Sequence, residues 1–88
     1  MNWTVNFTEE ADEQLQKLDK PIRERIRKYV KDLEKLPNPK IRADTLKGDL
    51  GEFYKYRVGD YRLICRIEDD KLLVLVVKIG HRSKVYKR

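Results

Sequence analysis

Cysteine, histidine and long apolar runs are the scarcest features of this 88-residue sequence. The single cysteine, Cys65, cannot form a disulfide within the chain, and no cysteine or histidine cluster has the spacing of a zinc site. No apolar run approaches the roughly 18 residues needed to span a bilayer, and no signal-like segment opens the chain. We therefore expect a cytoplasmic protein with no metal, no cofactor and no membrane span.

Positive charge, by contrast, is abundant and unevenly distributed. Lys plus Arg number 21 against 15 Asp plus Glu, for a formal net charge of +6. Residues 1–44 contribute +1 and residues 45–88 contribute +5. A concentrated basic surface usually binds a polyanion, most commonly a nucleic acid. A charged surface that only maintains solubility is the plainer alternative.

The first half of the chain predicts a strand and two helices within one domain, residues 1–88, because a second core would be too small to be stable. Residues 2–7 alternate between apolar and polar, as in a half-buried strand. Thr8 is expected to cap the first helix, and Lys20-Pro21 to separate it from the second. Pro37-Asn38-Pro39 is expected to end the second helix. One apolar stripe runs along that helix: Ile22, Ile26, Tyr29, Val30, Leu33 and Leu36.

After a polar connection through Leu46-Lys47-Gly48, the apolar period changes from 3.6 to 2. Strands are expected over residues 53–58, 61–67 and 72–79, with turns at Gly59-Asp60 and Asp69-Asp70. The last run is almost continuously apolar, which predicts a central strand buried on both faces and ended by Gly80. The fold class is therefore α+β: an N-terminal strand, a helical hairpin, and a three-stranded antiparallel meander with both helices on one face.

The other face of this sheet is predicted to be basic. The alternation places on it Lys55, Arg57, Arg62 and Arg66. Cations on adjacent strands repel one another, and a surface made only for solubility would intersperse acids among them. The pattern therefore favours a surface that binds phosphates.

Four motifs make a family resemblance specific: Leu46-Lys47-Gly48, Tyr54-Lys55-Tyr56-Arg57, Gly59-Asp60-Tyr61-Arg62-Leu63 and Gly80-His81-Arg82-Ser83-Lys84-Val85-Tyr86. In order and spacing they resemble the RelE toxin family over nearly the whole chain. The resemblance implies cleavage of messenger RNA in the ribosomal A site, without a metal. In this reaction a ribose 2′-OH attacks the adjacent phosphorus and leaves a 2′,3′-cyclic phosphate. It also implies a partner, a RelB-like antitoxin that silences the toxin.

The resemblance also implies roles for the cations. Arg62 is expected to stabilise the transition state, because a guanidinium can bind two phosphate oxygens at once. A surface ion pair with Asp60 or with an acid on the neighbouring strand is its plainer interpretation. Lys55 is the general base, a charge stabiliser or a plain phosphate contact. Arg57 positions the backbone or helps to lower the pKa of the attacking hydroxyl. A base role requires Lys55 to lose its proton, which the neighbouring cations favour.

The C-terminal motif is expected to complete the site. Tyr86 either stacks on a base or takes part in proton transfer, and either His81 or Arg82 assists departure of the 5′-oxygen. Further RNA contacts are expected from Lys47, Arg66 and Lys84. The given sequence ends at Arg88, without the extra C-terminal helix of some relatives. Inhibition is therefore expected to cover the basic face or to displace Tyr86.

Two other functions compete with this interpretation. A ParE-like toxin shares the fold but acts on DNA gyrase, and such chains generally lack this set of strand cations and terminal His-Arg and Tyr. A non-catalytic module would use the same cations only to hold RNA. For the antitoxin we expect an acidic segment against the basic face and an amphipathic helix in an apolar groove.

Overall fold

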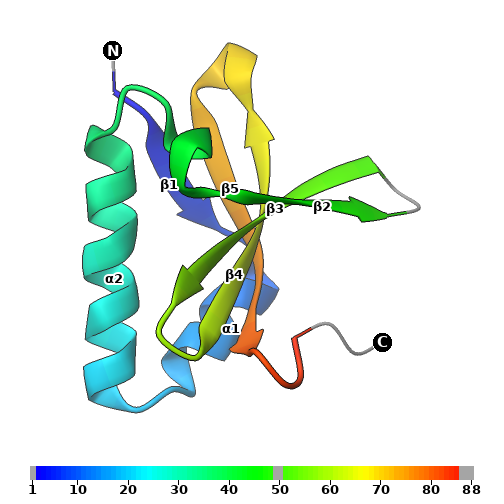
Figure 1. Ribbon diagram of the computed structural model, residues 1–88. Helices are drawn as coiled ribbons and strands as arrows, with labels where there is room; N and C mark the ends of the chain where they lie inside the picture. Colours follow the sequence, from blue (N-terminus) through cyan, green and yellow to red (C-terminus); the bar gives the residue numbers. More distant parts are fainter. Residues whose placement is uncertain (1, 49–50, 86–88) are drawn as a thin grey trace.

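The computed structural model describes residues 2–48 and 51–85 and confirms the α+β fold class (Figure 1). Its elements are β1 Thr4–Phe7, α1 Glu9–Gln16, α2 Lys20–Lys35, β2 Asp44–Gly48, β3 Gly51–Val58, β4 Tyr61–Glu68 and β5 Leu73–His81. Two short 3-10 helices, Pro39–Arg42 and Asp69–Lys71, join α2 to β2 and β4 to β5. No helix in the described ranges has both the length and the apolar character needed to cross a bilayer.

The five strands form one mixed sheet in the order β1-β5-β4-β3-β2. β1 runs parallel to β5, and the other three pairs are antiparallel. The predicted turn between β3 and β4 is present, with Gly59 at φ +60°. Glycine adopts this left-handed conformation without steric cost, so a two-residue turn can join the strands. The turn sets the register in which Arg57 lies directly opposite Arg62.

The segment predicted as a polar connection is instead the edge strand β2. Asp44 to Gly48 pair in register with Lys55 to Gly51 of β3. The strand is short and polar, a composition that protects sheet edges from pairing with other chains. An edge strand of this kind has little of the apolar alternation by which a strand is recognised, and the prediction failed for that reason.

The last strand differs from the prediction in its bounds and in its burial. β5 begins at Leu73 and continues through Gly80 to His81. Only one of its faces is buried: Val74, Val76 and Ile79 are at most 3% exposed, and the residues between them are half-exposed. The continuous apolar run predicted a strand buried on both faces. This prediction was wrong, because helices cover only one face of β5.

Both helices pack on the same face of the sheet, as predicted. Thr8 caps α1, its Oγ1 accepting a hydrogen bond from the Ala11 backbone N–H at 3.2 Å. The apolar stripe of α2 packs on the sheet, and one cluster joins helix and strand residues: Ala11, Leu15, Ile26, Val30, Leu33, Tyr56, Val58, Leu63, Cys65, Val74, Val76 and Ile79. We call the opposite, helix-free side the open face, and it carries Lys55, Arg57, Arg62, Ile64, Arg66 and Lys78.

Hydrogen bonds fix the end of α2 and the segment that follows it against the sheet. The hydroxyl of Tyr56, a fully buried β3 residue, donates to the Pro39 carbonyl at 2.8 Å. At the other edge, the Val5 backbone N–H donates to Glu34 Oε2 at 2.9 Å. The indole N–H of Trp3 donates to the Pro37 carbonyl at 3.0 Å. The helices thus hold a rigid sheet whose open face is left for another role.

Candidate nucleic-acid interface

The four predicted cations lie together on the open face of β3 and β4. Lys55 is opposite Ile64, and Arg57 is opposite Arg62, in adjacent positions of the antiparallel pair. Their neighbours in sequence, Tyr56 and Leu63, point into the core with no exposed area. The alternation therefore directs the cations outward, as the sequence predicted.

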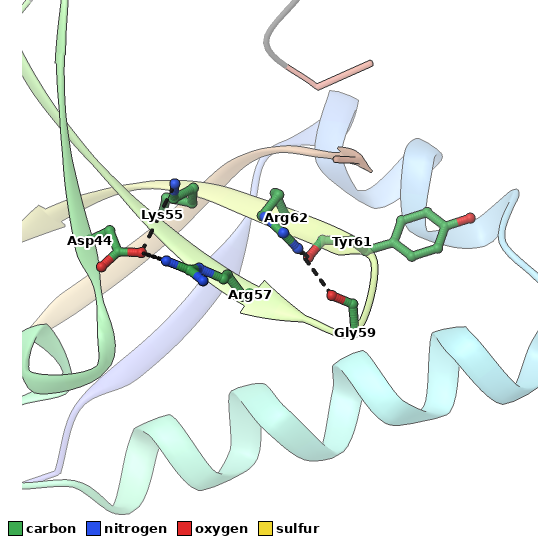
Figure 2. A network of polar contacts seen from close by, with 6 residues as sticks. All are labelled: Asp44, Lys55, Arg57, Gly59, Tyr61 and Arg62. Atoms are coloured by element: carbon green, nitrogen blue, oxygen red, sulfur yellow. Dashed lines mark hydrogen bonds and ion pairs between the residues drawn. The ribbon is translucent and has the colours of Figure 1, made fainter. Parts of the chain in front are cut away.

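Asp44 of β2 contacts two of these cations, and sequence reasoning missed it. Its Oδ2 lies 3.0 Å from Arg57 Nη2 and 4.0 Å from Lys55 Nζ (Figure 2). The Arg57 side chain is 64% exposed and that of Lys55 only 19%, so Arg57 is the cation freer to move. Because the edge strand itself was not predicted, no signal placed this acid among the cations.

Arg62 turns toward the β3–β4 turn and away from Arg57 (Figure 2). Its Nη1 donates to the carbonyls of Gly59 at 3.0 Å and Tyr61 at 2.9 Å. Within residues 2–48 and 51–85, its Nε and Nη2 have no hydrogen-bond partner. The side chain is therefore oriented by one nitrogen and keeps two donors for a ligand. Among the described residues, the plainer alternative, an ion pair of Arg62 with Asp60 or with an acid on the neighbouring strand, is not formed.

The opposed guanidinium groups make this part of the sheet suited to an anion. Like charges directly opposite each other on adjacent strands destabilise a sheet, by roughly 0.2–1 kcal/mol. Here Arg57 leans toward Asp44 and Arg62 toward the turn carbonyls, which separates the two charges. A phosphate between them would receive donors from both, and guanidinium groups form paired hydrogen bonds with phosphate oxygens.

The two candidate proton donors at the end of β5 have different contacts. His81 is opposite Tyr61, and their rings meet edge to face with centroids 5.6 Å apart. His81 Nδ1 accepts the Ser83 backbone N–H at 3.2 Å, so the neutral ring carries its proton on Nε2. The Arg82 backbone N–H donates to the Asp60 carbonyl at 2.8 Å, and its Nε lies 3.9 Å from Asp60 Oδ1. Arg82 thus adjoins the turn that also orients Arg62.

The remaining predicted residues are spread around this centre. Arg66 lies two positions beyond Ile64 on the open face and is exposed. Lys84 is exposed in the turns after β5, and Val85 packs against Gly80, where an added Cβ would approach Val85 Cβ to 3.2 Å. Lys47 lies on β2 in register with Glu52. Tyr86 lies outside the described residues.

The buried thiol and phenol groups, which other enzymes use for catalysis, are part of the core here. Cys65 has no exposed area, and burial raises the pKa of its thiol, which keeps the thiol protonated and unreactive. Burial likewise raises the pKa of the Tyr56 hydroxyl. In the described part of the chain, no three His, Cys, Asp or Glu side chains gather into a metal-binding group. The open face is therefore the chemically equipped surface of the molecule.

Comparisons with known proteins agree with the resemblance seen in the motifs. Residues 5–86 match the family model described as ParE toxin of type II toxin-antitoxin system, parDE. The mRNA interferase toxin RelE of Escherichia coli is 34% identical over 90 residues, covering 98% of this chain and 92% of that protein. Toxin RelG of Mycobacterium tuberculosis is 32% identical over 90 residues and covers 100% of both chains.

Solved structures of the same kind share the fold. The toxin-antitoxin complex RelBE2 from Mycobacterium tuberculosis gives a TM-score of 0.82 at 29% identity, covering 96% of this chain and 95% of the matched chain. A mutant of Escherichia coli toxin RelE in the free state gives 0.75 at 27% identity, covering 98% and 92%. The chain therefore belongs to the RelE family of toxins of type II toxin-antitoxin systems.

Proposed function

We propose that this chain is a metal-independent messenger RNA interferase that cuts messenger RNA in the ribosomal A site. Relatives at 34% identity are named mRNA interferases, which supports an endoribonuclease activity. The observation that carries the proposal is the Arg57–Arg62 pair on the open face, with two guanidinium donors of Arg62 unused among the described residues. This pair matches the charge that accumulates on a phosphorane.

In the proposed reaction the nucleophile belongs to the substrate. The ribose 2′-OH attacks the neighbouring phosphorus, the bond to the 5′-oxygen breaks, and a 2′,3′-cyclic phosphate remains. Arg62 Nε and Nη2 bind the non-bridging oxygens as their negative charge grows, and Arg57 leaves Asp44 to bind the same phosphate. Lys55 accepts the proton of the 2′-OH or stabilises its developing charge.

The leaving 5′-oxygen must gain a proton or a compensating charge. The contacts of Arg82 with Asp60 favour Arg82 for this role, because they hold it at the turn that orients Arg62. His81 packs on Tyr61, away from the open face. Tyr86 is proposed to stack on a base, and Lys47, Arg66 and Lys84 to bind the RNA backbone outside the cleaved bond.

An antitoxin partner is part of the proposal. Matched structures are described as toxin-antitoxin complexes, among them the RelBE complex of Escherichia coli at a TM-score of 0.70 and 26% identity. We propose that a RelB-like partner lays an acidic segment on the open face and an amphipathic helix in an apolar groove. A partner that still binds after Lys55, Arg57, Arg62 and Arg82 are all changed to Glu would contradict this.

The proposal is tested by messenger RNA cleavage in a purified translation system, with ribosomes present or omitted and with end-group analysis. The ribosome-free sample contains EDTA, and the ribosomal sample retains the magnesium that ribosomes need. We expect site-specific cuts with 2′,3′-cyclic phosphate ends, and a loss of about 100-fold or more in rate for Arg62→Ala. Arg27→Ala, which removes an exposed cation of α2, is the matched control and should cut normally.

A gyrase-directed toxin is the second candidate, because the matching family model is described as ParE. It predicts inhibition of supercoiling by purified gyrase and intact messenger RNA. A folded protein that blocks growth, inhibits gyrase and leaves RNA uncut would replace the interferase proposal with this one.

A further inference from the structure

A shallow pocket lies on the open face beside the cations, and the proposed cleavage chemistry does not use it. Its volume is about 430 Å³, and it is lined by Glu10, Phe53, Ile64, Arg66, Val77 and Lys78. The apolar floor comes from three neighbouring strands, with Phe53 on β3, Ile64 on β4 and Val77 on β5. A concave apolar patch beside a few polar groups is a common form of ligand site.

Two cations beside this floor have no partner among the described residues. Within residues 2–48 and 51–85, the side chains of Arg66 and Lys78 form neither an ion pair nor a hydrogen bond. Lys78 and Lys55 are the register partners of Ile64 on its two sides, so lysines flank the apolar floor. The combination suits a ligand that has both a flat apolar part and a negative charge.

A β-bulge places Lys78 on this face. Ile64 pairs with Lys78 and Cys65 with Val76, which leaves Val77 as an extra residue in β5. Val74 and Val76 point into the core, so regular alternation would have directed Lys78 inward as well. The bulge instead turns Lys78 to the open face and Ile79 to the core. Bulges of this kind commonly re-aim a side chain next to a functional site.

The pocket is also one step along the sheet from the Arg57–Arg62 pair. Successive residues on the same face of a strand lie about 6.6 Å apart, comparable to the step between phosphates in an extended RNA strand. Ile64 is the next open-face residue after Arg62, and Phe53 is the second after Arg57. An RNA with one phosphate at Arg62 would bring a neighbouring nucleotide over the pocket.

We propose that this pocket is a nucleotide subsite for single-stranded RNA, next to the cleaved bond. The base lies against Phe53 and Ile64, and Arg66 and Lys78 bind its phosphate. Glu10, at the rim on α1, accepts a hydrogen bond from a base that carries an amino group, so it is a specificity-determining residue. The choice of RNA as the ligand and the identity of the neighbouring phosphate as the cleaved one rest on the proposed function, whereas binding is tested apart from cleavage.

RNA is favoured over a partner protein as the occupant for two reasons. The pocket is short, whereas an amphipathic helix presents anchors over several turns and needs a longer groove. It is also continuous with the cations of β3 and β4, which a nucleotide chain would follow with its phosphates. Occupancy by an antitoxin segment alone is the competing result that the experiment below can give.

The test measures the binding of fluorescein-labelled single-stranded 2′-O-methyl RNA hexamers by fluorescence anisotropy. These probes lack the 2′-OH, so binding is read independently of cleavage. Each probe is intact or carries one abasic position. The variants are Phe53→Ala with Leu75→Ala as its control, since Leu75 is a half-exposed residue of the same face outside the pocket. Arg66→Glu/Lys78→Glu is matched by Lys20→Glu/Lys31→Glu, exposed lysines of α2.

We expect one abasic position to weaken binding to the wild-type protein and to Leu75→Ala by roughly tenfold, and to weaken binding to Phe53→Ala by less than about twofold. The charge reversal in the pocket should weaken binding further than its control. Glu10→Ala should remove a preference for amino-bearing bases at that same position. Thermal unfolding of each variant verifies that it folds.

An abasic penalty that is the same in Phe53→Ala and the wild type at every position overturns the proposal, as does absence of RNA binding. In that case a protein segment is the better occupant. The cleavage assay is independent of this binding test. If the protein binds these probes as expected but cuts no messenger RNA, the subsite proposal stands and the interferase proposal is contradicted.

Discussion

The two faces of the sheet use the same strands for opposite purposes. On the helix-covered face, Tyr56, Leu63 and Cys65 have no exposed area and join one apolar cluster with both helices. On the open face, the residues between them are cations and half-exposed apolar groups. These residues add little buried apolar area, and the opposed charges of Arg57 and Arg62 repel each other. We therefore expect substitutions on the covered face to change stability and substitutions on the open face to change the proposed RNA chemistry.

Truncation of neighbouring residues on β4 should give the largest contrast between the faces. Leu63→Ala leaves a cavity under the helices and should lower the free energy of unfolding by about 2–5 kcal/mol. Ile64→Ala, one residue along on the open face, should cost about 1 kcal/mol because its surroundings are partly solvent. Urea denaturation measures both, and equal losses would contradict the assignment of a single buried face.

Alkaline pH should act mainly through the covered face. Burial raises the pKa values of Cys65 and Tyr56 above their ordinary values of 9.0 and 10.0. A raised pKa in the folded state contributes stability that is complete below the unfolded pKa and is lost as pH rises toward the folded one. Stability should therefore fall above about pH 9, first through Cys65, by about 1.4 kcal/mol per pH unit for each group.

Cys65→Ala provides the control for this pH dependence. The variant is less stable at neutral pH, but its free energy of unfolding should be nearly constant between pH 9 and pH 10. In the wild-type protein, the group that ionises most strongly over this range is the Cys65 thiol of the unfolded chain, and the variant lacks it. Urea midpoints across this range measure the slope. A decline as steep as that of the wild type would assign the effect to other groups.

The smallest effect is expected at the edge of the open face. Asp44→Asn removes the ion pairs with Arg57 and Lys55, which should cost about 0.2–1 kcal/mol because the Arg57 pair is exposed and Lys55 Nζ lies 4.0 Å from the carboxylate. The same change releases both cations from an acid that competes with phosphate. RNA affinity at low salt should therefore rise, as measured by anisotropy. Weaker RNA binding would instead make Asp44 a positioning residue for Arg57.

Most of the framework was predictable from the sequence because it follows simple periods. The stripe of α2 and the alternation of β3 and β4 indicated which residues face the helices, and the structure confirms them. The exceptions have local causes. β2 is a polar edge strand, and the continuous apolar run of β5 contains a bulge and has only one buried face.

The candidate site was predictable in its chemistry and only partly in its geometry. Alternation placed Arg57 and Arg62 on one face, since each is adjacent in sequence to a core residue, Tyr56 or Leu63. No pattern indicated that Asp44 would hold Arg57 or that turn carbonyls would hold Arg62, because both depend on strand register. The outward orientation of Lys78 could not be predicted for the same reason, because the bulge that causes it is a feature of the register between β4 and β5.

The most direct test of the account measures stability and cleavage together in Arg62→Gln. If the open face is built for RNA at the expense of stability, loss of one opposed charge should leave the free energy of unfolding unchanged or raise it by up to about 1 kcal/mol. Messenger RNA cleavage should fall by about 100-fold or more. A variant that is destabilised yet still cuts would contradict the account, because Arg62 would then be a structural residue.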